Sequence, residues 1–165
     1  MRIFLFIRSL GLGGAERQLL TLAEGLSIHH DVTVLTFYDD LEYKFYNVKN
    51  RKYRYINLKK KGRWDIFGFA WRFLSEVRCL DPHVIYAFMN TASIFSLLSR
   101  LVSSRIKIIW GIRSSNMKLE NYGFIQKFLR LIECKVSVFS DLVISNSYEG
   151  KIQAKIDGYK ARNFK

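Results

Sequence analysis

The chain has 165 residues, of which 49% are hydrophobic, and its formal net charge is +13 at pH 7. That length can bury one substantial core, and no apolar run approaches the ~18 to 20 residues that cross a bilayer, so we expect one domain and exclude a transmembrane helix. The positive charge predicts attraction to an acidic partner: nucleic acid, an anionic membrane surface or a phosphorylated substrate.

The opening of the chain is a short apolar run that breaks into glycines. Residues 2–7 read as a buried strand, Gly11 to Gly14 as a turn, and the apolar residues that follow have the spacing of a helix. Free N–H groups and a partial charge of roughly +0.5 at the start of a helix favour an anion such as a phosphate. Glycines let the backbone approach that anion closely, so we interpret the turn as part of a binding site.

Strands and helices alternate along the rest of the chain. Apolar, β-branched runs predict strands at 31–37, 53–58, 83–88, 106–112 and 141–147, and helical spacing predicts helices at 65–79, 91–102, 124–136 and 148–158. This alternation is typical of α/β proteins, and we expect a doubly wound, mainly parallel, Rossmann-like sheet.

Three of these helices carry many apolar side chains. We expect Asp65 to cap the helix at 65–79 and its aromatic residues to pack against the sheet, with a role at a membrane interface as the alternative. For the helix at 91–102 we expect a buried stripe, and the helix at 124–136 reads as amphipathic. The apolar positions are Phe67, Trp71, Phe73, Leu74 and Val77 in the first, Ile94, Leu97, Leu98 and Leu101 in the second, and Phe124, Phe128, Leu131, Ile132 and Val136 in the third.

The candidate site residues are those that directly follow predicted strands. In a doubly wound sheet the ligand crevice lies beyond the carboxyl ends of the strands, near the point where the strand order reverses. The candidates for binding substrate or diphosphate are Gly13, Gly14, Glu16, Asn90, Arg113, Ser114, Ser147 and Glu149. For the two glutamates, an equally good interpretation is that each complements a helix N-terminus. No His or Cys spacing fits a metal site, so we predict no metal.

A basic segment runs from residue 44 to residue 63. It has nine Lys and Arg residues, no acidic residue, and several interleaved aromatic residues. Such a mixture suits a lipid headgroup interface or single-stranded nucleic acid, and a solvated loop with an edge strand explains it equally well. The residues that we predict to form a membrane or anion patch are Lys59, Lys60, Lys61 and Arg63.

Three motifs, in this order and at this spacing, resemble the N-terminal half of retaining GT-B glycosyltransferases. They are Gly13–Arg17 after the first strand, Asp81–Ile85 before the fourth, and Val143–Glu149 near the end. The resemblance covers essentially the whole chain. It implies a nucleotide-sugar-dependent glycosyltransferase of glycan, polysaccharide or glycolipid biosynthesis, with the nucleotide sugar as co-substrate, no separate cofactor, and a glycan or lipid-linked acceptor.

The resemblance also implies a division of labour between two domains. Residues 1–165 would be the N-terminal, acceptor-side domain, and the C-terminal nucleotide-sugar domain would be absent from this chain, which would then be inactive alone. Gly13 and Gly14 would face the donor diphosphate or the acceptor. Many members have a histidine where this sequence has Arg113. An arginine keeps its charge, so we expect it to position the substrate electrostatically, or else to pair with a nearby carboxylate, and we assign no catalytic residue.

Two other function classes stay open from the residues. One is a dinucleotide-binding oxidoreductase domain, since Gly11 and Gly13 match the first two glycines of G-x-G-x-x-G; against it, Glu16 occupies the third position. The other is a basic, non-enzymatic nucleic-acid-binding module. Because no reader motif accompanies the basic segment, we expect no specific nucleic acid partner.

The expected location is the cytoplasm, with peripheral contact to the inner face of the membrane. The apolar run before Arg8 is too short for a signal peptide and lacks a cleavage site. Cys79 and Cys134 lie in apolar, helical surroundings, which is typical of reduced core cysteines in cytosolic proteins. The basic segment would supply the contact to anionic lipid.

Overall fold

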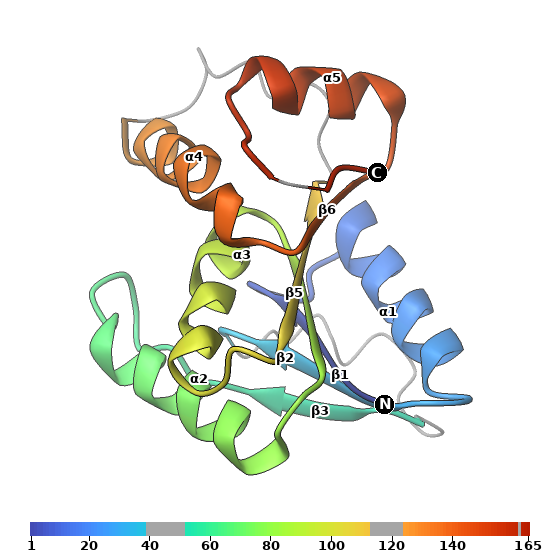
Figure 1. Ribbon diagram of the computed structural model, residues 1–165. Helices are drawn as coiled ribbons and strands as arrows, with labels where there is room; N and C mark the ends of the chain where they lie inside the picture. Colours follow the sequence, from blue (N-terminus) through green and yellow to red (C-terminus); the bar gives the residue numbers. More distant parts are fainter. Residues whose placement is uncertain (39–51, 113–123, 162) are drawn as a thin grey trace.

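The computed structural model describes residues 1–38, 52–112, 124–161 and 163–165. Within these ranges the strands form one six-stranded parallel sheet in the order β3-β2-β1-β4-β5-β6 (Figure 1). The strands are β1 (Arg2–Ile7), β2 (Asp31–Thr36), β3 (Arg54–Asn57), β4 (Val84–Phe88), β5 (Lys107–Ile112) and β6 (Leu142–Ser145). The helices are α1 (Gly14–Leu26), α2 (Phe67–Leu80), α3 (Asn90–Ser96), α4 (Phe124–Val136) and α5 (Tyr148–Ile156), with 3₁₀ segments η2 (Leu97–Leu101) and η4 (Ser137–Phe139).

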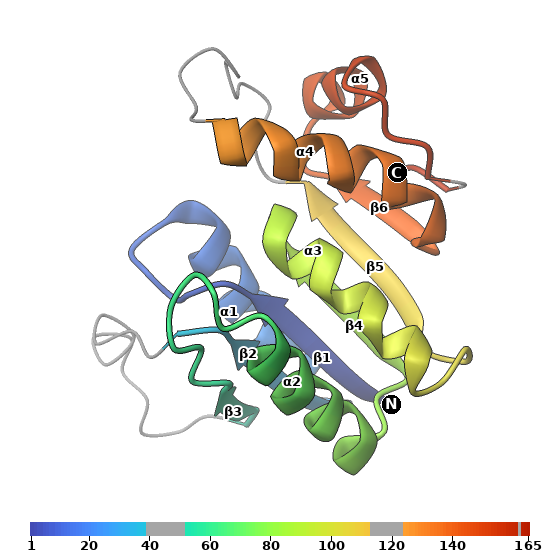
Figure 2. The same cartoon turned by 90° about the vertical axis from the view of Figure 1, so that its left-hand side faces the viewer.

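The central strand β1 is buried on both faces, as expected of a strand inside a parallel sheet. Its side chains alternate between two cores. Leu5 and Ile7 pack in the core beneath α1, while Phe4 and Phe6 join the core that α2, α3 and α4 cover. Figure 2 shows these three helices side by side, with α1 behind the sheet. The continuous apolar run at 3–7 is therefore required by the position of β1.

The connections place the reversal of strand order between β1 and β4. From β1 the chain passes through α1 to β2 on one side of the sheet, and it returns through α2 to β4 on the other side of β1. The segments that leave β1 and β4 thus lead to helices on opposite faces, and in open α/β sheets the ligand crevice lies beyond the carboxyl ends of two such strands. The predicted doubly wound, parallel fold is confirmed, and each predicted strand and helix is present.

The helix predicted at 91–102 differs from the expected one. Residues 97–101 form a 3₁₀ segment, and Leu101, expected to be buried, is 72% exposed. The buried positions are small instead: Ala92, Ser93, Ser96 and Ser99. Small side chains allow α3 to approach the sheet closely, and the serine hydroxyls are satisfied locally. The Ser96 hydroxyl donates to the Ser93 carbonyl at 2.6 Å and accepts from the indole N–H of Trp110 at 3.1 Å.

The helix α2 also corrects two expectations. Asp65 does not cap it, because the N-cap position is Ile66 and no side chain caps the helix there. Phe67 and Trp71, expected to pack against the sheet, are 90% and 70% exposed. The sheet is covered by Phe69, Phe73 and Val77, which are fully buried. Near the end of the helix Cys79 is exposed, whereas Cys134 of α4 is buried as predicted.

The helix α4 buries a polar network and exposes part of its apolar stripe. Phe128 and Leu131 are 54% and 60% exposed, while Arg130 and Glu133 are buried. The Arg130 guanidinium lies 3.3 Å from the Glu133 carboxylate, 2.7 Å from that of Asp157 and 2.7 Å from the Tyr159 hydroxyl. These contacts tie α4 to the end of α5. Burial raises the pKa of Glu133, and the adjacent arginine acts in the opposite direction.

No helix in the described parts of the chain is long and apolar enough to cross a membrane.

We predict that Arg130→Met lowers the free energy of unfolding by about 3–5 kcal/mol, because it leaves buried carboxylates without their cation. Urea unfolding measures the effect, with the exposed Arg105→Met as the control. The unpaired Glu133 would have a folded-state pKa above its unfolded value, so the variant should regain stability as the pH falls from neutral. The double variant R130M/E133Q should recover part of the loss. An Arg130→Met cost no larger than that of Arg105→Met would contradict this account of the network.

Candidate functional site

Four of the predicted site residues follow the paired strands β1 and β4, at the position where a doubly wound sheet has its ligand crevice. Gly13, Gly14 and Glu16 follow β1, and Asn90 follows β4, which pairs directly with β1 through Phe6 and Ala87. All four lie at the carboxyl edge of the sheet. Sites for small ligands in open α/β sheets lie at this position, so the arrangement identifies this edge as the candidate site.

Position 13 favours glycine because the Glu16 side chain approaches its backbone closely, and not because its dihedral angles are unusual. Gly13 is the N-cap of α1 and has an extended backbone, with φ −81° and ψ 167°. The Glu16 carboxylate folds back over it, so a Cβ at position 13 would lie 2.2 Å from Glu16 Oε2. This places a negative charge in the first turn of α1, where it complements the helix dipole. An incoming phosphate must displace that carboxylate or bind beside it.

Gly14 presents open space to the crevice. An added Cβ there would meet no atom within 4 Å, and the residue is exposed at the first position of α1. The N-cap residue of α1 is Gly13, which has no side chain that could accept a hydrogen bond from the first-turn N–H groups. Gly14 therefore offers room for a ligand at the positive end of the helix.

The backbone at Met89 is strained on the opposite wall of the crevice. Met89 has φ 71° and ψ 156°, a region that is essentially restricted to glycine, and its side chain is 40% exposed. It lies between β4 and Asn90, and its carbonyl accepts hydrogen bonds from Ser93 N at 3.0 Å and Ser93 Oγ at 3.1 Å. Strain of this kind clusters at functional sites. Residue type alone gives no sign of it, because a sequence signal for this conformation would have been a glycine.

The residues after β6 flank the crevice at a greater distance. Ser147 caps α5, since its hydroxyl accepts a hydrogen bond from Gly150 N at 3.0 Å. Glu149 is exposed in the first turn of α5, where it complements the helix dipole. β6 is separated from β4 by β5, so these side chains are not brought together with the glycine turn. Arg113 and Ser114 lie outside the described residues.

The predicted basic patch lies at the same edge, in the loop between β3 and α2. Lys59, Lys61 and Arg63 are exposed. Lys60 instead folds inward: its backbone N–H donates to the Phe37 carbonyl at 2.7 Å, and its amino group donates to the carbonyls of Gly62 and Arg63. Partial desolvation is the main cause that lowers the pKa of Lys60, and Arg8 and Arg72 act in the same direction. Lys60 therefore supports the loop and does not extend the exposed patch.

Arg8 is a site candidate that the sequence patterns did not single out. It follows β1 directly and is exposed, and its guanidinium carbon lies 5.6 Å from the centre of the Tyr38 ring. Its carbonyl accepts from Phe37 N at 3.0 Å, which fixes the backbone at the end of β2. Its position could have indicated this role in the sequence, because Arg8 is the first residue after the central strand. It adds a positive charge near the glycine turn.

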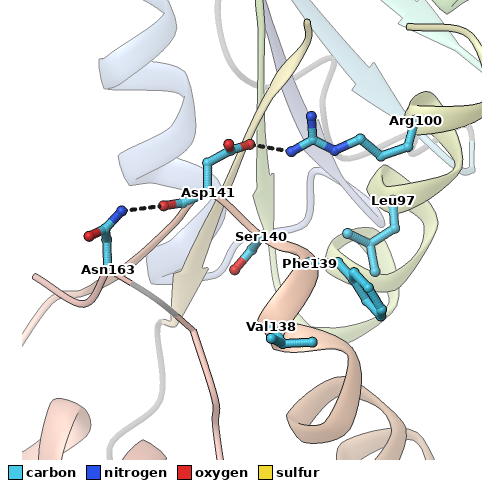
Figure 3. A pocket seen from close by; sticks show the side chains of 7 residues that line it. All are labelled: Leu97, Arg100, Val138, Phe139, Ser140, Asp141 and Asn163. Atoms are coloured by element: carbon cyan, nitrogen blue, oxygen red, sulfur yellow. Dashed lines mark hydrogen bonds and ion pairs between the residues drawn. The ribbon is translucent and has the colours of Figure 1, made fainter. Parts of the chain in front are cut away.

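A cavity lies elsewhere, at the amino edge of the sheet (Figure 3). Its volume is about 620 Å³, and its lining includes Leu97, Phe139 and the ion pair between Arg100 and Asp141. Arg100 also donates to the carbonyls of Ser104 at 2.7 Å and Ile106 at 2.8 Å. Because these contacts use its donors for the fold, we assign the cavity no ligand. The described residues include no group of three His, Cys, Asp or Glu side chains that could hold a metal ion.

The strand order and the helices define a Rossmann-like α/β domain, and its candidate site is the carboxyl edge at β1 and β4. The family model described as Glycosyltransferase Family 4 matches residues 12–155. The chain therefore belongs to Glycosyltransferase Family 4, and the resemblance to GT-B glycosyltransferases is confirmed. Family membership selects the first of the three function classes considered above. Among curated protein sequences, none matches the chain.

Solved structures with this fold are longer than the chain. HepE from Anabaena in complex with UDP-glucose has a TM-score of 0.78 and 17% identity, and the match covers 100% of this chain and 43% of HepE. The apo form of the lipopolysaccharide outer core galactosyltransferase WaaB has a TM-score of 0.70 and 12% identity, covering 100% of this chain and 44% of WaaB. The chain thus spans less than half the length of these proteins, and likeness at this identity establishes the fold alone.

We predict that Met89→Gly is more stable than Met89→Ala by about 1–3 kcal/mol, because only glycine adopts this backbone region without strain. Both variants remove the same exposed side chain, so their difference isolates the backbone. As the control, Thr21→Gly at an exposed position in the middle of α1 should be less stable than Thr21→Ala by about 1 kcal/mol. Urea unfolding of the four variants measures both differences. An alanine variant at least as stable as the glycine variant at position 89 would show that the backbone there is unstrained.

Proposed function

We propose that this chain is the N-terminal, acceptor-side domain of a nucleotide-sugar-dependent glycosyltransferase that builds a glycan, polysaccharide or glycolipid of the cell envelope. The proposal rests on one combined observation. In a chain of Glycosyltransferase Family 4, the glycine turn after β1 and the strained Met89–Asn90 segment after β4 lie on either side of the reversal in strand order.

A UDP-sugar is the donor class that the proposal favours. HepE is described in complex with UDP-glucose, and WaaB is described as a galactosyltransferase. In glycosyl transfer the bond between the sugar's anomeric carbon and the diphosphate oxygen breaks, a bond to an acceptor hydroxyl oxygen forms as that hydroxyl releases its proton to water, and the nucleoside diphosphate leaves with added negative charge. The N-terminus of α1 and the cation at Arg8 would stabilise that charge. Arg113 remains a predicted positioning residue.

The proposed partners follow from the length and the surface of the domain. A C-terminal GT-B domain would supply the second wall of the cleft and most contacts to the nucleotide, and this domain alone would not catalyse transfer. The acceptor would be a glycan or a lipid-linked glycan. We place the enzyme in the cytoplasm, in peripheral contact with the inner face of an anionic membrane. The positive charge would give only non-specific attraction to nucleic acid.

The experiment compares two glycines of α1 that differ only in their distance from the crevice. An added Cβ meets no atom within 4 Å at either Gly14 or Gly25, and both are exposed. We predict that Gly14→Leu lowers kcat/KM by more than about tenfold, because the side chain occupies the space of the ligand, whereas Gly25→Leu stays within about twofold. The assay measures UDP release from a panel of UDP-sugars by the complete protein with lipid extract as acceptor.

Near-ultraviolet circular dichroism confirms that both variants fold. The proposal would be abandoned if Gly14→Leu and Gly25→Leu were equally active. It would also be abandoned if no UDP-sugar were consumed while NAD bound saturably.

A further inference from the structure

Three aromatic side chains at the start of α2 project into solvent. Trp64, Phe67 and Trp71 are 86%, 90% and 70% exposed, and Ile66 between them is 46% exposed. We call Trp64, Phe67 and Trp71 the aromatic ridge. Phe67 and Trp71 lie one helical turn apart on α2, and Trp64 lies in the turn just before the helix. Exposed apolar side chains that are grouped in this way mark interaction surfaces.

Among the described residues, the aromatic ridge takes no part in the two hydrophobic cores. The sheet-facing stripe of α2 consists of Phe69, Phe73 and Val77, which are fully buried. Phe67 and Phe69 are two residues apart, which is about 200° around a helix, so the two stripes lie on nearly opposite faces. The helix thus has one apolar stripe that builds the core and a second, shorter one that the domain leaves uncovered.

The ridge is held in place by a set of contacts below it. The Asp65 carboxylate accepts from Lys61 N at 2.8 Å and pairs with Arg72, whose Nε donates to the Leu58 carbonyl at 2.7 Å. Ile66 N donates to the Trp64 carbonyl at 2.8 Å. Gly68 packs so closely that an added Cβ would lie 2.5 Å from Asp65 Oδ1. These contacts fix the loop before α2, so the projection of Trp64 is built into the fold.

Positive charge surrounds the ridge. Lys59, Lys61 and Arg63 are exposed beside it, and the one carboxylate of the loop, Asp65, is already paired with Arg72. The hydrogen bond from Lys61 N is the main cause that lowers the pKa of Asp65, so this carboxyl stays ionised and paired. Tryptophan prefers the headgroup region of a bilayer, and lysine and arginine are attracted to anionic lipid.

We propose that the aromatic ridge inserts into the headgroup region of an anionic lipid bilayer, with Lys59, Lys61 and Arg63 pairing with lipid phosphates around it. Charge complementarity selects this occupant over an apolar protein surface, which would leave three exposed cations unmatched. The proposed membrane surface therefore combines the apolar ridge with three cations. Lys60 takes no part in it, because its amino group donates to carbonyls within the loop.

The ridge lies at the edge of the sheet that carries the candidate site. β3 ends at Asn57 at the carboxyl edge, and α2 starts from that edge and runs back toward the start of β4. Docking through the first turns of α2 therefore brings the crevice at Gly13 and Gly14 close to the headgroups. This geometry would present a lipid-linked acceptor to the crevice, a consequence that rests on the proposed function, whereas the docking itself does not.

Tryptophan fluorescence tests the insertion directly, because the chain has three tryptophans and the third, Trp110, is fully buried. The protein is mixed with vesicles of phosphatidylcholine alone or of equimolar phosphatidylcholine and phosphatidylglycerol. We expect the emission to shift to shorter wavelength only with the anionic vesicles, and lipids brominated on their acyl chains to quench it. The double variant W64F/W71F keeps the apolar ridge and Trp110, so it should bind the vesicles without the shift or the quenching.

Matched variants separate the apolar contribution from the charge. F67S/W71S should lower vesicle partitioning by more than about tenfold, whereas the exposed control I28S/I156S should leave it unchanged. K59Q/K61Q/R63Q should lower partitioning by roughly a hundredfold, at about fivefold for each charge removed, and R105Q/K155Q/K160Q by much less. Co-sedimentation measures partitioning, and urea unfolding confirms that each variant is folded.

The proposal would be overturned by binding without quenching of Trp64 and Trp71, by equal binding to neutral vesicles, or by no binding at low salt. Binding of RNA in preference to anionic vesicles would equally overturn it. UDP-sugar consumption in detergent is assayed separately, so that loss of vesicle binding with intact turnover refutes the docking and leaves the proposed glycosyl transfer standing.

Discussion

The burial of β1 on both faces is the constraint on which the rest of the structure depends. A parallel strand with neighbours on both sides needs helices above and below it, so the connections must leave in opposite directions. The core side chains Leu5 and Phe6, neighbours in sequence, serve the two cores separately. The crevice beyond β1 and β4 is the direct result, and the glycine turn and Met89 owe their positions to it. The aromatic ridge follows from the same plan, because α2 must return across the sheet from its carboxyl edge.

Most of the fold could be predicted from the sequence because strands buried on both faces are continuous apolar runs with clear ends. Helix faces were harder to predict where the core selects small or charged residues. Ser96 at the end of α3, Ser99 just after it, and Arg130 with Glu133 in α4 are buried. A prediction from the large apolar residues alone therefore assigned the buried face of these helices wrongly. Satisfied hydroxyls and a paired guanidinium replace apolar burial there, and hydrophobic periodicity does not register such substitutions.

In the candidate site, too, some features could be predicted from the order of residues and others depend on how the chain packs. The glycine turn was predictable because a strand, glycines and a helix follow in order. The placement of Glu16 in the first turn of α1 was one of the two interpretations open from the sequence. The strain at Met89 depends on a backbone dihedral angle that residue type does not specify. The inward turn of Lys60 could not be predicted either, because the sequence does not distinguish it from the three neighbouring basic residues. In the fold, Lys60 is the one whose backbone N–H donates to the Phe37 carbonyl.

Amide hydrogen exchange on the complete protein, with and without UDP-glucose, tests most directly whether the carboxyl edge at β1 and β4 is the binding wall. Slower exchange is predicted in residues 8–16 and 89–91 when the donor is added, with no change around the cavity at the amino edge, at residues 97–101 and 138–141. Protection at the amino edge with none at 8–16 and 89–91 would contradict the assignment of the site.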